Sequence, residues 1–159
     1  MTVRPPRNPT PRFDAMLGLL CEPEHPALAG FPTEAWCDFQ WTSIIHGIRS
    51  INLTKAPGDL KPIVSAIDDW NRNWRLGVIL EARVGPGRLL VSAIPLNKQD
   101  PVTAQLRESL TRYAESDRFN PSTRLTPEKA ASLWSSQGGR PSPPSHRFDP
   151  DQDDGTGPR

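Results

Sequence analysis

The sequence predicts an α/β domain with a sheet of at least four or five strands and a long helix packed on one face. Two apolar runs of strand length, 76–84 and 88–94, flank Gly85-Pro86-Gly87, which is typical of a hairpin. Residues 101–115 place apolar side chains at the spacing of one helical face. Along the chain these signals give the order strand, helix, several strands, helix.

The first half of the domain is expected to contain one helix and three strands. Residues 16–21 are an apolar run that ends before Pro23, because proline cannot continue a strand ladder. Thr33 is the expected cap of a helix over residues 34–47. Short strands are expected at 50–54 and 61–68, on either side of a Pro-Gly turn. The apolar face of the helix is marked by Trp41, Ile44, Ile45 and Ile48.

The second half is expected to contain the hairpin and two helices. Gly85-Pro86-Gly87 is a turn and not a phosphate-binding loop, because a strand and not a helix follows it. Asp100 and Pro101 predict a helix start, and Thr126 with Pro127 predict another near the end of the domain. The buried stripe of the first of these helices is Val102, Leu106, Leu110 and Tyr113.

The distribution of proline indicates the limits of the folded domain, and the net charge indicates which partners to expect. Residues 1–12 and 135–159 are rich in proline and poor in apolar residues, so we expect both to be disordered around a folded domain at 13–134. A net charge of +1 without a long basic run predicts no nucleic-acid partner. The chain shows neither a membrane-length apolar run nor a secretory signal, so no membrane partner is expected. The compartment is undetermined.

Metal and nucleophile chemistry find little support in the sequence. Cys21 and Cys37 fit neither a metal cluster nor a disulfide framework, so two free thiols are expected, with a single bridge as the alternative. His25 precedes a proline in a loop and His46 lies near a predicted helix end. There is no nucleophile elbow to accompany either histidine. We therefore predict no metal, no cofactor and no catalytic triad.

Acidic side chains are the better candidates for acid–base chemistry. Glu34 and Asp38 are four residues apart and would share a helix face. Asp68 and Asp69 end an apolar strand, a place where parallel sheets commonly present functional groups. Two carboxylates can act on a glycosidic bond when they are about 5 to 10 Å apart. The alternative is that all four are solvated loop and cap residues.

Tryptophans beside polar side chains suggest a sugar-binding site, since a pyranose ring stacks on an aromatic face. Trp36 and Trp41 form one such group, and a second lies in the polar segment 68–74. The alternative is that these aromatics anchor loops to the core. The candidate carbohydrate-binding residues are Trp70, Trp74, Asp68, Asp69 and Arg72.

Three segments resemble a known family. Residues 17–41, 67–96 and 105–122 together resemble the C-terminal region of large, β-galactosidase-like bacterial proteins of glycoside hydrolase family 2. More distantly, "HPALAGFP" at 25–32 and "GRLLVSAI" at 87–94 resemble the class I glutamine-amidotransferase-like fold of trehalose-utilisation proteins. This resemblance implies an α/β, flavodoxin-like sheet with flanking helices. The sheet is expected to be incomplete, because the part of that fold that carries the nucleophile elbow would lie before Met16.

The resemblance implies a non-catalytic accessory or assembly domain, because the catalytic carboxylates of such enzymes lie in an upstream barrel. The expected partners are upstream glycoside hydrolase domains or a second copy of the chain. Two alternatives stay open. The first is a carbohydrate-binding module that uses the exposed tryptophan and aspartate residues of segment 68–74. The second is a small glycoside hydrolase that uses Glu34, Asp38 or Asp68.

Overall fold

The sheet is organised around one long central strand, β4 (Leu76–Val84), which pairs with four other strands. β2 (Ile51–Asn52) and β3 (Val64–Asp68) pair antiparallel with its first residues. β5 (Gly87–Ser92) pairs antiparallel with its second half, and β6 (Arg124–Leu125) lies parallel to its end. β1 (Met16–Cys21) extends the sheet beyond β3. This computed structural model describes residues 16–45, 48–70, 72–97 and 99–135.

The expected α/β class is confirmed, with a six-stranded mixed sheet and two α-helices. The flavodoxin-like arrangement is not confirmed. A flavodoxin-like sheet is parallel and joins its strands through crossover helices. Here β1, β2, β3 and β5 all pair antiparallel with their neighbours, and only the two-residue β6 runs parallel to β4.

The predicted hairpin is confirmed. β4 and β5 are joined by Gly85 and Pro86, and Gly85 has a φ of +57°, a conformation that glycine adopts without steric cost. The strands predicted at 50–54 and 61–68 are also present, as the shorter β2 and β3. The strand predicted at 16–21 is β1.

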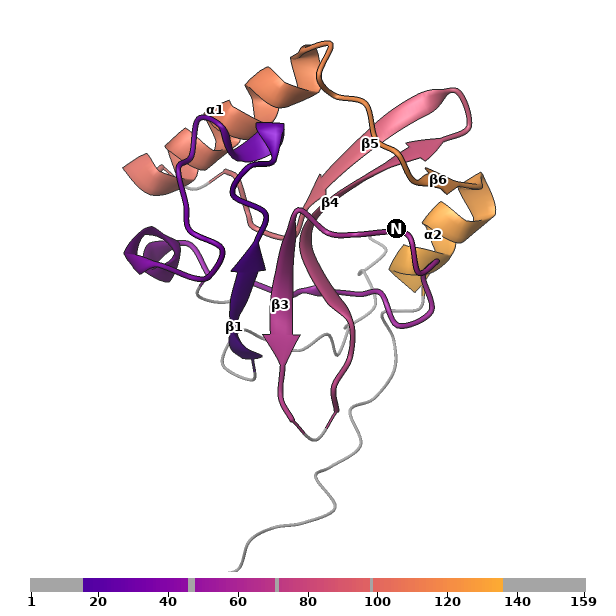
Figure 1. Cartoon of the computed structure of the whole chain (residues 1–159), viewed down its shortest axis with the longest axis horizontal. Coiled ribbons are helices and arrows are strands. Elements are labelled where there is room, and N and C mark those ends of the chain that lie inside the picture. Colours follow the sequence, from indigo (N-terminus) through magenta and orange to yellow (C-terminus); the bar gives the residue numbers. More distant parts are fainter. Residues whose placement is uncertain (1–15, 46–47, 71, 98, 136–159) are drawn as a thin grey trace, which may run out of the picture.

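Both predicted helix starts are confirmed. α1 (Pro101–Glu115) is capped by Asp100, whose carboxylate accepts from the amide of Thr103 at 2.9 Å. α2 (Pro127–Ser135) follows Thr126, whose hydroxyl oxygen accepts from the amide of Lys129 at 3.3 Å. Figure 1 shows the two helices well apart, with α1 near the short 3-10 turn η2 (Pro26–Leu28) and α2 next to β6.

The prediction of a helix over residues 34–47 is wrong. The structure has only a short 3-10 helix there, η3 (Phe39–Ser43). The segment before it is extended because it pairs with β1: the amide of Cys21 donates to the carbonyl of Ala35, and Leu20 forms a β-bridge with Trp36. The four apolar residues of the predicted helical face are nevertheless buried: Trp41, Ile44, Ile45 and Ile48.

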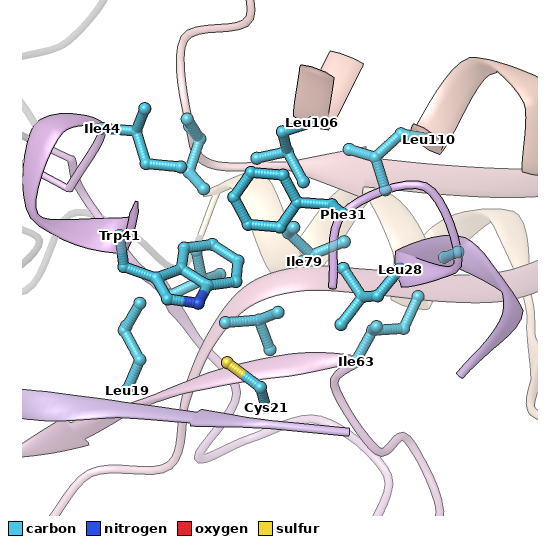
Figure 2. Packing of buried hydrophobic residues seen from close by; sticks show 14 of the residues in the cluster. Leu19, Cys21, Leu28, Phe31, Trp41, Ile44, Ile63, Ile79, Leu106 and Leu110 are labelled. Carbon is cyan, nitrogen blue, oxygen red and sulfur yellow. The ribbon is translucent and has the colours of Figure 1, made fainter. Parts of the chain in front are cut away.

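Two apolar cores lie against the sheet. The larger one contains inward-facing residues of β1 and β3, the 28–31 segment, η3 and α1. Figure 2 shows Phe31 in its middle, next to Leu106 of α1 and to Trp41, whose ring centroid is 5.0 Å from that of Phe31. The smaller core brings Leu133 of α2 against Leu80 of β4 and Leu53. β4 is therefore buried on both sides along most of its length.

The ends of the chain were predicted to be disordered at 1–12 and 135–159. All of these residues except Ser135 lie outside the described residues, and Ser135 ends α2. His46 also lies outside the described residues.

Candidate functional site

The predicted carbohydrate-binding residues lie at the end of β3 and in the turn that leads to β4, but most of their polar groups bind one another. The Asp68 side chain is almost fully buried and accepts from Nη2 of Arg72 at 2.7 Å and from the amide of Trp74 at 2.9 Å. Nε of Arg72 lies 3.1 Å from Oδ2 of Asp69. The guanidinium of Arg72 also lies over the ring of Trp74, 5.4 Å from its centroid. These contacts hold the turn in shape.

Trp70 differs from the rest of this group. Its side chain is 88% exposed, whereas Trp74 is partly buried against the larger core. The turn reverses tightly around it, because the amides of Arg72 and Asn73 both donate to the carbonyl of Asp69. Asn73 takes a φ of 48°, which asparagine tolerates better than most residues. Trp70 is therefore presented to solvent next to these backbone hydrogen bonds.

The structure does not place Glu34 and Asp38 on a helix face, since the helix predicted for them is absent. Instead the amide of Glu34 donates to Oδ2 of Asp38 at 3.4 Å, which closes a local turn. The expectation that Asp68 and Asp69 end a parallel strand is also wrong, because β3 pairs antiparallel with both neighbours.

An apolar surface remains open on the outer side of β1 and β3. Leu19, Cys21, Val64 and Ala66 point into the larger core, so the residues that alternate with them face away from α1. Leu20 is 53% exposed and lies directly across from Trp36, which is 60% exposed. Ile67 lies across from Gly18, and Leu17, at the β-bulge beside it, is 69% exposed. We call this set, Leu17, Leu20, Trp36 and Ile67, the open face.

A polar cleft with a volume of about 470 Å³ opens beside Glu81 of β4. Oε2 of Glu81 accepts from the Tyr113 hydroxyl at 2.6 Å, and Oε1 lies 3.7 Å from Nε2 of His25. His25 and Tyr113 also touch edge to face, with ring centroids 5.4 Å apart. The cleft is lined by Glu22, His25, Asp59, Lys61, Pro62, Ile63, Glu81, Ser122 and Thr123.

The protonation of this group follows from its surroundings. Burial and then the hydrogen bond to Glu81 raise the pKa of Tyr113 well above its ordinary value, so the hydroxyl keeps its proton and donates to the carboxylate. Nδ1 of His25 accepts from the amide of Ala27 at 3.2 Å, at the start of η2. The proton of the neutral imidazole is therefore on Nε2, the nitrogen that faces Glu81.

The two cysteines are free thiols in the structure, as predicted. Cys21 is buried, and desolvation raises the pKa of its thiol from 9.0 to about 11. Burial and the neighbouring charge of Asp38 raise the pKa of Cys37 as well. Among the described residues, no group of three or more His, Cys, Asp or Glu side chains is arranged to hold a metal ion.

The fold and sites define a small α/β domain with an open apolar face and a polar cleft. Residues 6–135 match a family described as a domain of unknown function, DUF8487. The chain belongs to this family, and the match spans all of the described residues. None of the curated proteins compared with the chain matches it. No helix within the described ranges combines the length and apolar character needed to cross a membrane.

Sequence reasoning missed the cleft, because its lining residues His25 and Glu81, and the Tyr113 that binds Glu81, come from three distant segments. His25 was interpreted as a loop residue, Glu81 as a polar position of a hairpin strand, and Tyr113 as part of a buried helix stripe. One signal was present: Glu81 is an acidic residue in an otherwise apolar strand. A carboxylate in such a place requires polar partners, and Tyr113 and His25 supply them.

Proposed function

We propose that this chain is a non-catalytic assembly domain that docks through its open face onto a second copy of itself. The observation that carries the proposal is the row of exposed apolar side chains across three neighbouring segments of the sheet. Monomeric proteins rarely expose contiguous apolar patches larger than a few hundred Å², and larger patches commonly mark interaction sites. Trp36 contributes a tryptophan, one of the residue types enriched among the residues that dominate the binding energy of interfaces.

A second copy fits this surface, because the open face is apolar and carries no charge that would repel the same charge on the other copy. The outward positions of β1 and β3 opposite one another are Leu20 with Ser65 and Gly18 with Ile67, all uncharged. A two-fold interface uses the same patch on both subunits, so a single self-compatible surface is sufficient. β1 also ends the strand order of the sheet, which places the open face next to a sheet edge.

The resemblance of residues 17–122 to family 2 glycoside hydrolase-like proteins supports a carbohydrate-active enzyme as the larger assembly that this domain serves. In that case upstream glycoside hydrolase domains would be the alternative occupant of the open face. We do not extend the proposal to a flavodoxin-like fold, because the antiparallel strand pairing argues against it.

The test is sedimentation velocity over a range of concentrations, on the parent chain and two lysine variants. Leu20→Lys puts a charge in the middle of the open face, and Thr111→Lys adds the same charge at an exposed position of α1. We expect the parent and Thr111→Lys to self-associate and Leu20→Lys to sediment as a monomer that still melts cooperatively, at a temperature that no longer depends on concentration. A parent that is a monomer at every concentration, or equal behaviour of the two variants, contradicts the proposal.

Carbohydrate binding is the second candidate function, and the exposure of Trp70 favours it. An exposed indole offers a stacking face to a sugar ring. Asp68 and Arg72 are already paired with each other, so they contribute to the shape of the turn more than to a ligand. Quenching of tryptophan fluorescence by a sugar, lost in Trp70→Ala, would support this candidate, and no response across a sugar panel would contradict it.

The hydrolase alternative gains no support from these residues. Asp38 is held by the amide of Glu34, and both carboxylate oxygens of Asp68 accept hydrogen bonds within their own turn. We therefore make no catalytic proposal for Glu34, Asp38 or Asp68.

A further inference from the structure

The cleft around Glu81 presents a fixed hydrogen-bond donor next to a fixed acceptor. Nε2 of His25 carries the donor proton, because Nδ1 is occupied as the acceptor for the Ala27 amide. Oε1 of Glu81 is the acceptor, because Oε2 already binds the Tyr113 hydroxyl. The two atoms are 3.7 Å apart, too far for a good hydrogen bond to each other and close enough to serve one small group together.

The charges around this pair select among ligand classes. Three carboxylates line the cleft, from Glu22, Asp59 and Glu81, against the single ammonium of Lys61. An anionic ligand would be repelled by them. An ammonium group that donates to Oε1 of Glu81 would lie next to the N–H of His25. It could not accept from that N–H, because it has no lone pair. A neutral group that both accepts and donates satisfies both atoms.

We propose that the cleft binds a small neutral polyol through adjacent hydroxyl groups, one accepting from Nε2 of His25 and one donating to Oε1 of Glu81. Hydroxyls are both donors and acceptors, and the carboxylates of Glu22 and Asp59 accept from further hydroxyls of the same ligand. The volume of about 470 Å³ lies within the roughly 300–1,000 Å³ of small-ligand pockets.

Tyr113 is a positioning residue for this site. It does not line the cleft, but its hydroxyl holds the Glu81 carboxylate from behind and its ring packs against His25. The two sites are separate, because the cleft lining and the open face share no residue. The polyol proposal therefore does not rest on the assembly proposal.

The test is a titration of the full chain by amide chemical-shift perturbation in NMR with probes of one scaffold. The probes are a vicinal cyclohexanediol, the matching diamine and the matching dimethyl ether, with myo-inositol and D-glucose as natural polyols. We expect saturable shifts around His25 and Glu81 with the diol and with at least one natural polyol. The diether is expected to bind at least roughly tenfold more weakly, since it has no donor for Oε1 of Glu81, and the diamine is expected to bind more weakly than the diol.

Two variants assign the effect to the proposed atoms. Glu81→Gln keeps an oxygen for Tyr113 and removes the charged acceptor, and His25→Asn keeps a good acceptor for the Ala27 amide and removes the Nε2 donor. Each is expected to weaken polyol binding by roughly tenfold or more. Glu108→Gln makes the same chemical change at an exposed position of α1 and is expected to leave binding unchanged.

Three results would overturn the proposal: no saturable shift with any polyol, tighter binding of the diamine than of the diol, or polyol binding that persists in both cleft variants. Tyr113→Phe separates positioning from a purely structural role. It is expected to weaken the diol more than the diether while the fold, followed by the amide spectrum, is kept. Leu20→Lys is expected to leave polyol binding unchanged, so failure of the polyol site and failure of self-association can be told apart.

Discussion

Replacement of Asp68 by alanine is expected to destabilise the domain strongly without removing any ligand contact. The Asp68 carboxylate is buried and accepts two hydrogen bonds, from Nη2 of Arg72 at 2.7 Å and from the amide of Trp74 at 2.9 Å. Loss of a buried acceptor leaves its donors unpaired, at a cost of about 1–3 kcal/mol for each, more where a charge is involved. Arg72 keeps its contact with Asp69 at 3.1 Å, which limits its share of the loss.

The expected loss is therefore about 2–4 kcal/mol in the free energy of unfolding, measured by urea denaturation. Asp68→Asn keeps an oxygen for the Trp74 amide and is expected to lose less than Asp68→Ala. Asp69→Ala is the matched control: its side chain is 30% exposed, so the change is expected to stay below about 1 kcal/mol. If Asp68→Ala were as stable as Asp69→Ala, the interpretation of Asp68 as the anchor of the turn would be refuted.

Three further changes test the packing and titration of the domain. Nη2 of Arg75 donates to the carbonyls of Leu53, Ala56 and Pro57, so Arg75→Met is expected to lower the free energy of unfolding by about 2–3 kcal/mol, with partial recovery in Arg75→Lys. A Cβ on Gly77 would lie 2.9 Å from Cδ1 of Leu53, so Gly77→Ala is expected to cost about 1–3 kcal/mol, and less when combined with Leu53→Val. Calorimetry of these four variants checks both statements, and equal losses in the single and double Gly77 variants would argue against the clash. Because the pKa of Cys21 is raised from 9.0 to about 11, its contribution to stability is fully present below pH 9 and is lost as the pH rises through 11. The stability difference between the parent and Cys21→Ala is expected to shrink across that window, and a pH-independent difference would show that the thiol titrates normally.

Elements with strong local signals were predictable from the sequence. The hairpin depends on a glycine at positive φ between two strand-like runs, and α1 depends on its Asp-Pro start and its apolar stripe. These signals act over a few residues and do not require knowledge of distant contacts. The buried face of residues 41–48 was also correct, because burial follows side-chain type even where the backbone is not helical.

The errors come from contacts between distant parts of the chain. Residues 35–36 are extended because β1 pairs with them, and nothing within the segment itself competes with the helix pattern. Strand direction was likewise taken from the resemblance, since periodicity is the same for parallel and antiparallel strands. The same holds for the candidate sites. The exposure of Trp70 could be expected from its polar neighbours in the sequence. The pairing of His25 with Glu81 could only be seen in the folded chain.

The central claim is that the open face is an interface between two copies of this chain, and the molar mass in solution tests it most directly. In light scattering on the purified chain across a concentration series, the measured molar mass is expected to rise from 17.7 kDa toward twice that value. The rise should be absent in Leu20→Lys and present in Thr111→Lys. A parent chain that stays at 17.7 kDa and melts cooperatively at every concentration would contradict the account.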